Sequence, residues 1–258
     1  MNKKNSLVLV GSGIKFLSHM TMETKAYIKQ ADHVLYLVNE PLMKEWIQKT
    51  NFNSESLDDL YKKFQLRIEC YEAITNFILE KVRKGSHVCV VFYGHPTVFA
   101  KPGLDAACLA KKEGYDVRIL PGVSTEDCLF ADLLIDPSSC GKQSFEATDF
   151  LIYRRKFDPC SHLILWQADV IGAVNNPEYF NNEIGIKLLY NYLRTYYESA
   201  HKIILYEAAQ YPGFAPKIET YTLRELAKIK LTSISTLYFP PLPKTPYDYP
   251  IAKALNLI

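Results

Sequence analysis

The stretch Val88-Cys89-Val90-Val91-Phe92-Tyr93-Gly94-His95-Pro96, residues 88–96, decides the fold. A nonpolar run of this length is typical of a strand that is buried on both faces, as in parallel sheets covered by helices. Gly94 and Pro96 then turn the chain into a loop, and residues 104–113 have the pattern of a helix. Because ligands bind at the carboxyl ends of strands in open α/β sheets, the stretch predicts a buried strand that carries a ligand-binding loop.

The first half of the chain repeats this alternation of short nonpolar runs and helical patterns. We expect strands at residues 7–10, 34–38, 88–93 and 117–120, and helices at residues 21–30, 41–48, 66–84 and 104–113. Strands that are separated by helices favour parallel pairing, because the helix returns the chain to the same end of the sheet. The first half is therefore predicted to form a mostly parallel sheet covered by helices.

The second half of the chain contains more strand than helix. We expect strands at residues 150–153, 162–166, 203–206 and 233–238, with helical segments at residues 186–197 and 223–228. The turn-rich stretch Asp136–Gly141 separates the two halves. We therefore predict two α/β lobes: residues 1–136, and residues 137–258 with a mixed sheet and an extended proline-rich arm at residues 240–250.

Composition excludes several classes of protein. The chain has 258 residues, a net charge of +2 and no long block of Lys or Arg, which argues against nucleic-acid binding. None of the six cysteines falls in a Cys-x-x-Cys pair and the six histidines are scattered, which argues against a metal site and for reduced thiols. The nonpolar run Leu7–Val10 is too short for a signal peptide or a membrane span, so we expect a cytoplasmic protein with no membrane partner.

Two other loops follow predicted strands. Gly11-Ser12-Gly13 lacks the third glycine of a dinucleotide fingerprint, since Phe16 stands at that position, so an NAD site is not expected. This loop is either a tight turn or an approach to a ligand. In the second loop, Pro121-Gly122-Val123-Ser124-Thr125, Ser124 is either a ligand contact or the N-cap of the next helix.

The order of these three loops resembles the tetrapyrrole methylases. A first strand followed by Gly-x-Gly, a strand followed by Gly-x-Pro, and then Pro-Gly-Val-Ser-Thr occur in that order along the chain. The resemblance covers essentially the whole chain. It implies two α/β lobes with S-adenosylmethionine in the cleft between them, and a homodimer.

Further motifs resemble one branch of this family, the borosin peptide backbone α-N-methyltransferases. The motifs are Tyr93-Gly94-His95-Pro96, Ala131-Asp132-Leu133 with Ile135-Asp136-Pro137, Gln143-Ser144-Phe145-Glu146-Ala147, Leu165-Trp166-Gln167, Tyr206-Glu207-Ala208-Ala209 and Ile234-Ser235-Thr236-Leu237. The resemblance implies methylation of backbone amides in a ribosomally made precursor peptide. Because no core peptide is evident after the arm, we expect the split type, in which the precursor is a separate protein.

The residues that this chemistry needs are present near the helix predicted at residues 66–84. A backbone amide nitrogen is a poor nucleophile, so its proton must be removed and the charge on the carbonyl oxygen stabilised. Arg67 and Tyr71 are four residues apart and share a helix face, with Tyr61 just before the helix. As the resemblance implies, Arg67 and Tyr61 bind the carbonyl, Tyr71 accepts the amide proton as a phenolate favoured by Arg67, and Tyr93 orients the methyl donor or the amide.

The resemblance also implies a set of residues that bind S-adenosylmethionine and its product S-adenosylhomocysteine, by nonpolar walls and small polar groups. They are Tyr93, His95, Val98, Phe99, Ser124, Thr125, Gln167, Tyr206, Ala208, Ser235 and Thr236. His95 is equally interpreted as a structural hydrogen-bonding residue. Thr97 departs from the glycine expected there, and its β-branched side chain narrows the conformations of the loop.

Three alternatives stay open from the sequence. The first is a methyltransferase of the same fold acting on a tetrapyrrole or another small molecule, although the chain shows no Arg and Lys cluster suited to a macrocycle with many carboxylates. The second is a noncatalytic module that binds the cofactor or a peptide. The third, for the catalytic set alone, is that the tyrosines pack in the core and Arg67 is a solvated surface charge.

Overall fold

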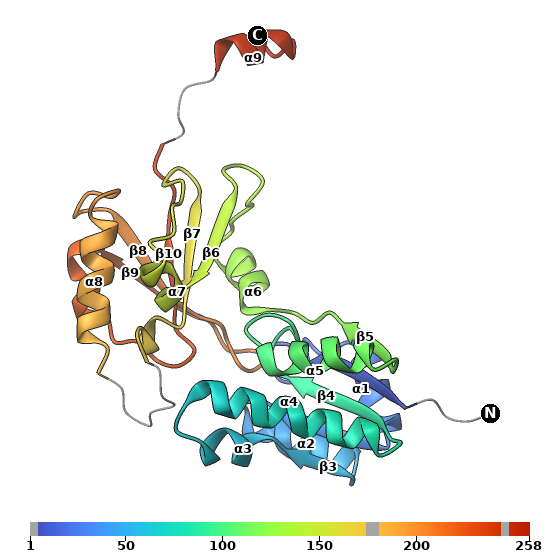
Figure 1. Ribbon diagram of the computed structural model, residues 1–258. Coiled ribbons are helices and arrows are strands. Elements are labelled where there is room, and N and C mark those ends of the chain that lie inside the picture. The colour runs from blue at the N-terminus through green and yellow to red at the C-terminus, as the bar shows by residue number, and fades with distance from the viewer. Residues whose placement is uncertain (1–4, 174–180, 244–247) are drawn as a thin grey trace. The chain divides into compact units, whose positions relative to one another are not determined.

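The structure, a computed structural model, describes residues 5–173, 181–243 and 248–258 (Figure 1). The chain forms two compact units. The first contains the residues up to Leu133 and also Ala208–Pro216; the second contains Leu134–Gly172, most of the chain up to Glu207, and the residues from Lys217 onward. The sequence prediction places one boundary at residue 136, whereas in the structure the segment Ala208–Pro216 returns to the first unit.

The first unit contains a five-stranded parallel sheet in the order β3-β2-β4-β1-β5. Its strands are β1 (Ser6–Gly11), β2 (His33–Leu37), β3 (Ser54–Ser56), β4 (His87–Phe92) and β5 (Asp116–Leu120). The helices are α1 (Met22–Gln30), α2 (Pro41–Thr50), α3 (Asp58–Lys63), α4 (Arg67–Arg83), α5 (Lys101–Lys112) and α6 (Thr125–Asp132). The predicted parallel sheet is confirmed, with β4, the strand that decides the fold, near its centre.

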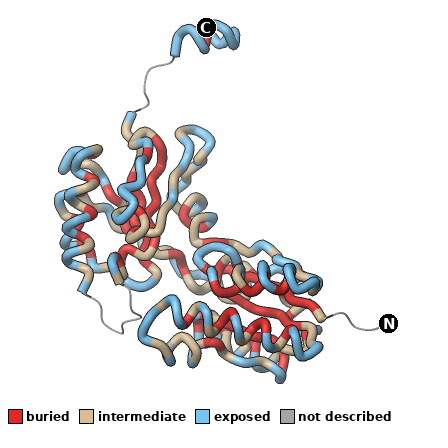
Figure 2. The backbone as a smooth tube through the Cα atoms, viewed as in Figure 1, coloured by how far each residue is buried: buried red, intermediate tan, exposed pale blue. Residues whose placement is uncertain are grey.

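The inner strands of this sheet, such as β1 and β4, are buried along almost their whole length (Figure 2). Leu7 and Leu9 of β1 belong to one core cluster, to which α4 and α5 also contribute. Val8 and Val10 belong to a second cluster with residues of α1 and α2. Because successive residues of a strand point to opposite faces, burial on both faces requires a continuous nonpolar run.

The second unit contains a mixed sheet in the order β6-β7-β10-β8-β9, in which only β6 and β7 pair in parallel. Its strands are β6 (Lys142–Glu146), β7 (His162–Trp166), β8 (Lys202–Glu207), β9 (Lys217–Thr222) and β10 (Thr236–Phe239). Its helices are α7 (Ala147–Ile152), η1 (Ala168–Val170), α8 (Glu183–Leu193), η2 (Leu223–Lys228) and α9 (Tyr249–Ala254). The predicted mixed sheet is confirmed.

The strand predicted at residues 150–153 is wrong, because these residues belong to α7 or follow it. Glu146 caps the amino end of this helix, where its Oε2 accepts a hydrogen bond from the backbone N–H of Asp149 at 2.7 Å. Phe150 is fully buried, whereas Ile152 and Tyr153 are exposed. The nonpolar run at residues 150–153 therefore contributes a buried face to a short helix. The strand of this region is β6 instead.

The tail also differs from the prediction. Instead of an arm that stays extended to residue 250, Asp248 caps the helix α9 by accepting a hydrogen bond from Ile251 N–H at 3.1 Å. Residues 244–247, the middle of the predicted arm, lie outside the described part of the chain. Within the described residues, no helix is both long and nonpolar enough to cross a membrane.

Candidate active site

Three loops of the first unit meet at the carboxyl ends of the neighbouring strands β1, β4 and β5. A methyl group on Gly11 would lie 2.1 Å from the carbonyl oxygen of Gly94, and one on Gly122 would lie 2.8 Å from the same oxygen. Gly13 and Gly94 bond to each other through their backbones, at 3.2 and 3.1 Å. The loop at Gly11 is therefore part of a tight backbone junction.

Tyr93 follows β4 and lies at this junction. Its hydroxyl donates a hydrogen bond to Oε1 of Gln210 at 2.9 Å. Burial raises the pKa of the Tyr93 phenol to about 12. Tyr93 is therefore a neutral phenol near pH 7, with its proton directed at a residue that sequence analysis did not select.

The loop after Tyr93 is closed by His95 and Thr97. Nδ1 of His95 accepts a hydrogen bond from the backbone N–H of Thr97 at 3.2 Å and lies 3.1 Å from the Thr97 hydroxyl. His95 therefore makes a structural hydrogen bond within the loop, and Thr97 contributes a contact that glycine lacks. The next residues, Val98 and Phe99, are 44% and 49% exposed. The structure therefore leaves two nonpolar side chains of the predicted cofactor set partly open to solvent.

Phe99 and Gln167 share an unusual backbone conformation. Their φ angles are 54° and 56°, in the left-handed region that side chains other than glycine rarely adopt. Such conformations cost about 1–3 kcal/mol each and concentrate at functional sites. Both residues belong to the predicted cofactor set, one in each unit.

Ser124 is the N-cap of α6, as one of the two readings of the sequence expects. Its hydroxyl donates to Oδ2 of Asp127 at 2.7 Å and accepts from the Asp127 N–H at 3.2 Å, while its own N–H donates to the same carboxylate at 2.7 Å. The side chain is therefore engaged in a reciprocal cap. Thr125 is the first residue of the helix beyond it.

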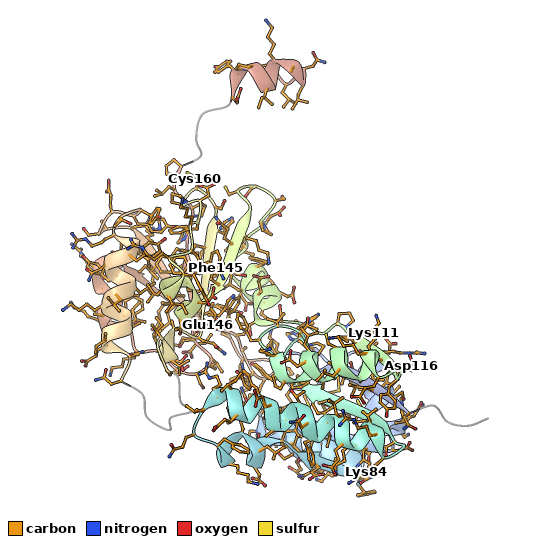
Figure 3. All side chains as sticks on the ribbon, in the orientation of Figure 1. Lys84, Lys111, Asp116, Phe145, Glu146 and Cys160 are labelled. Carbon is orange, nitrogen blue, oxygen red and sulfur yellow. The ribbon has the colours of Figure 1, made fainter. Side chains whose placement is uncertain are left out.

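In the second unit, the predicted cofactor residues gather at one end of the neighbouring strands β7, β10 and β8. Thr236 at the start of β10 lies opposite Trp166 on one side and Tyr206 on the other, and Gln167 follows Trp166 directly. Glu146, which is labelled in Figure 3, ends β6 and pairs with Trp166 in the strand register. The Oε1 atom of Glu146 is buried and has no hydrogen-bond partner within the described chain, so it is an acceptor at the same end of the strands.

Ser235 is held by a carboxylate. Its hydroxyl donates to Oε1 of Glu207 at 2.6 Å, and Thr232 donates to the same oxygen at 2.8 Å. The Thr232 N–H also donates to the Ser235 hydroxyl at 2.8 Å. Glu207 thus shapes the turn before β10, which delays this strand to Thr236 from the predicted start at residue 233. Ala208, the next predicted cofactor residue, is 5% exposed and belongs to the first unit.

The predicted amide-activating residues come together on α3 and α4 of the first unit. The rings of Tyr61 and Tyr71 lie 6.2 Å apart between centroids. Burial raises the pKa of the Tyr61 phenol well above its usual value; Tyr71 raises it further, while the Arg67 guanidinium acts in the opposite direction. Tyr61 is therefore a neutral phenol close to both other side chains.

Arg67 is half-buried rather than a solvated surface charge. Its Nε atom is shielded from solvent, and no described residue accepts a hydrogen bond from it. A buried guanidinium N–H without an acceptor is costly unless a ligand completes it. The chemistry of this donor fits a carbonyl or carboxylate oxygen.

Beyond Tyr71, a groove of about 440 Å³ lies between α4 and α5. Residues that line it include Ile68, Thr75 and Asn76 of α4 and Lys101 and Leu109 of α5. The described residues contain no group of three or more His, Cys, Asp or Glu side chains placed to hold a metal ion.

Sequence reasoning missed three residues of these clusters, namely Glu146, Glu207 and Gln210. Glu146 and Glu207 stand inside motifs that carry the family resemblance, so their positions were visible but their contacts were not. Gln210 is hydrogen-bonded to Tyr93, which is 117 positions away, and no local sequence pattern predicts such a pair. These contacts depend on the tertiary fold.

Comparison with known proteins gives one family match. The model of the Tetrapyrrole (Corrin/Porphyrin) Methylases matches residues 6–226. A solved structure of uroporphyrin-III C-methyltransferase from Thermus thermophilus, complexed with S-adenosylhomocysteine, superimposes with a TM-score of 0.62 and 17% identity, over 91% of this chain and 92% of that one. At this identity the similarity establishes the fold.

Sequence relatives are nearer. A Lentinula edodes protein, described as a methyltransferase and ribosomally synthesised precursor of the cyclic peptide lentinulin A, is 38% identical over 100% of this chain and 63% of its own length. A type I borosin cyclic peptide precursor and methyltransferase from Cerrena unicolor is 38% identical over 98% of this chain and 63% of its own length. The chain thus spans less than two thirds of each of these relatives.

Proposed function

The chain belongs to the tetrapyrrole methylase family, and from this premise we propose that it is an S-adenosylmethionine-dependent methyltransferase that methylates backbone amide nitrogens of a peptide. One observation carries the choice of acceptor. Arg67, Tyr61 and Tyr71 lie together, and the buried Nε of Arg67 lacks an acceptor among the described residues. A site built for an amide needs such a donor for the carbonyl oxygen and a neighbouring group for the N–H.

The carbonyl oxygen of the substrate amide accepts hydrogen bonds from Arg67 and from the neutral Tyr61 phenol. As the amide loses its proton, negative charge collects on this oxygen, so these donors bind more strongly in the transition state than in the ground state. The guanidinium and the phenol are held by the ends of two packed helices, so little reorganisation is needed when the charge develops.

Tyr71 takes the amide proton. The N–H bond breaks and the proton passes to the oxygen of Tyr71, which acts as a phenolate. The electron pair left on the nitrogen is then available for the new N–C bond. Arg67, four residues earlier on the same helix, is the positively charged group beside this base. The groove beside Tyr71 gives a peptide chain room on the side of α5.

S-adenosylmethionine supplies an electrophilic methyl group and leaves as S-adenosylhomocysteine. The residues present fit this molecule. In the first unit, Val98 and Phe99 offer partly exposed nonpolar side chains to the cofactor. Backbone and small polar groups are offered by the loops at Tyr93, His95, Ser124, Thr125 and Ala208. In the second unit, Gln167, Tyr206, Ser235 and Thr236 lie at one end of the strands β7, β8 and β10, with the Oε1 of Glu146, unpaired among the described residues, at the same end.

We further propose a separate precursor protein as substrate, a homodimer as the working form, and a cytoplasmic location. The relatives are described as methyltransferase and peptide precursor in one chain, so a peptide is the substrate class that they suggest. The balanced charge, a net +2 over 258 residues, gives no support for a nucleic-acid acceptor.

Transfer of a labelled methyl group tests this function. The protein is incubated with methyl-labelled S-adenosylmethionine and one of three acceptors: a small protein encoded beside it, the part of the lentinulin A precursor that this chain does not cover, or a uroporphyrinogen. We expect label on a peptide acceptor and none on the tetrapyrrole. Label on the tetrapyrrole alone would replace the proposal with a small-molecule methyltransferase, and cofactor binding without any transfer would favour a noncatalytic module.

A further inference from the structure

Gln210 is fixed on all sides by contacts within the first unit. Its side-chain Oε1 accepts from the Tyr93 hydroxyl at 2.9 Å, and its Nε2 donates to the carbonyl oxygen of Ala208 at 3.0 Å. Its own backbone carbonyl accepts from the N–H of Phe16 at 2.8 Å. The segment is tied down again one residue later, where the Tyr211 hydroxyl donates to Glu40. The amide group is therefore held in one orientation.

These contacts fix which atom of the amide faces Tyr93. The carbonyl of Ala208 can only accept, so the NH2 group of Gln210 must face it, and the amide oxygen must face Tyr93. That oxygen can also only accept, so the Tyr93 hydroxyl has to be the donor. A phenol has a single O–H hydrogen, and here Gln210 occupies it.

Tyr93 can therefore offer a ligand only the lone pairs of its hydroxyl oxygen. Because its hydrogen is bound by Gln210 and burial keeps the phenol protonated near pH 7, only the oxygen lone pairs remain. Tyr93 then has nothing to donate to the carbonyl oxygen of a substrate, which is the task of Arg67 and Tyr61. Its lone pairs suit an electron-poor partner, such as the C–H groups beside a sulfonium, which form weak hydrogen bonds to oxygen.

We propose that Gln210 is a positioning residue that fixes Tyr93 as a hydrogen-bond acceptor directed at the positively charged sulfonium methyl group of the cofactor. This inference rests on the proposed function for the identity of the cofactor. It assigns Tyr93 to the methyl donor rather than to the substrate amide. It also explains why residues 208–216 fold back onto the first unit, since they deliver the acceptor that orients this phenol.

Binding experiments without any acceptor peptide test the inference. S-adenosylhomocysteine lacks the methyl group and the positive charge, so the ratio of the two affinities isolates the contact with the sulfonium methyl. Methionine is similar in size to glutamine but offers no comparable acceptor. Gln210→Met is therefore expected to lower the preference for S-adenosylmethionine by about threefold to fivefold, as measured by calorimetry. Gln210→Glu retains an acceptor oxygen toward Tyr93 and is expected to restore part of the preference.

A double-mutant cycle separates positioning from a general structural role. Tyr93→Phe is expected to lower the same ratio, and Gln210→Met is expected to have no further effect in that background. Tyr211→Phe, which loosens the same segment at Glu40, is the matched control and should leave the ratio unchanged. If Gln210→Met does not fold, Tyr93→Phe and Gln210→Glu still give the comparison.

Three results would overturn the inference: equal losses of both affinities in Gln210→Met, an undiminished effect of Gln210→Met in the Tyr93→Phe background, or the same change of ratio in Tyr211→Phe. Failure to methylate a peptide would overturn the proposed acceptor but leave this contact standing. Absence of any binding of S-adenosylmethionine to the unchanged protein would overturn both.

Discussion

At the scale of single residues, the proposed chemistry depends on Arg67. Its guanidinium presents several N–H groups in a fixed plane, whereas a lysine ammonium is a point charge on a flexible stem. The charge alone lowers the pKa of a nearby phenol, but binding the amide oxygen together with Tyr61 requires the planar donors. The two tasks of Arg67 can therefore be separated by substitution.

Arg67→Lys is expected to reduce methyl transfer about a hundredfold, because one oriented donor to the developing oxyanion is lost. Affinity for S-adenosylmethionine should stay within about twofold, since no cofactor contact of Arg67 is invoked. The measurement is the single-turnover rate of labelled methyl transfer, with calorimetric affinity beside it. Arg83→Lys, which alters an exposed ion pair with Glu113 on the same helix, is the control and should keep full activity. A modest loss in Arg67→Lys, no greater than in the control, would contradict the role.

Tyr71→Phe removes the proposed base. The phenyl ring preserves packing against Tyr61, whose ring centroid lies 6.2 Å away, so the fold and cofactor binding should survive while methylation is lost. Circular dichroism and calorimetry check the fold and the binding, and mass spectrometry checks turnover. Surviving turnover would show that another group accepts the amide proton.

Residue types in local motifs are the part of the site that sequence could predict. Tyr61, Arg67 and Tyr71 lie within eleven consecutive positions, and helical spacing is enough to bring two of them onto one face. Gln210 was out of reach, because its partner Tyr93 is far along the chain and a glutamine in a loop carries no periodic signal. For Ser124 and His95 the sequence allows a ligand contact or a structural hydrogen bond. The hydrogen bonds of Ser124 to Asp127 and of His95 to Thr97 become visible only in the structure.

At the scale of elements, the junction of the loops after β1, β4 and β5 depends on glycine. The conformational freedom of Gly13 and Gly94, whose φ angles are 70° and 69°, lets the two loops bond backbone to backbone. Gly11 adds close approach, because its missing side chain leaves room for the carbonyl of Gly94. A small change here displaces the loop that holds Tyr93 and His95.

Gly11→Ala is expected to lower the free energy of unfolding by about 3 kcal/mol, since the new methyl group would lie 2.1 Å from the Gly94 carbonyl oxygen, where backbone must move. Gly114→Ala is the matched control. Nothing lies within 4 Å of a methyl group there, so only the positive φ of 87° costs stability, about 1 kcal/mol. Urea unfolding measures both. Equal losses in the two variants would mean that the close approach at Gly11 is not what holds the junction.

Sequence patterns predicted the buried elements better than the edge elements. The central strands β1, β4 and β7 have continuous nonpolar runs because both of their faces are covered. The strands β3, β6 and β9 lie at sheet edges and are rich in Ser, Glu, Lys and Thr, so they produce no such run. The nonpolar residues 150–152 were mistaken for a strand because a helix of only six residues is too short to show helical periodicity.

At the scale of the whole molecule, buried tyrosines determine the alkaline limit of stability. Burial raises the pKa of Tyr93 to about 12 and that of Tyr238 to about 12, and it raises those of Tyr61 and Tyr197 as well. A phenol whose pKa is higher in the folded state stabilises the fold fully below its unfolded pKa of about 10, and this contribution is lost as the pH rises through the folded value.

The free energy of unfolding is therefore expected to fall between pH 10 and pH 12. The contribution of Tyr238 is on the order of 2 kcal/mol across this window. Its phenol is 3% exposed and lies 2.6 Å from Nδ1 of His162. Urea unfolding at a series of pH values should give a shallower fall in Tyr238→Phe, whereas Tyr249→Phe, at a residue that is 70% exposed, should leave the slope unchanged. An identical slope in Tyr238→Phe would show that this phenol does not couple to folding.

The most direct test of the central claim is tandem mass spectrometry of a precursor protein after incubation with this enzyme and S-adenosylmethionine. Fragmentation locates each increment of one methyl group along the peptide and distinguishes the backbone nitrogen from the side chain. We expect methyl groups on backbone amides in the presence of the unchanged protein, and none with Tyr71→Phe. Methyl groups found only on side chains or on the N-terminal amine would contradict it, because those acceptors have no need of the Tyr61, Arg67 and Tyr71 set.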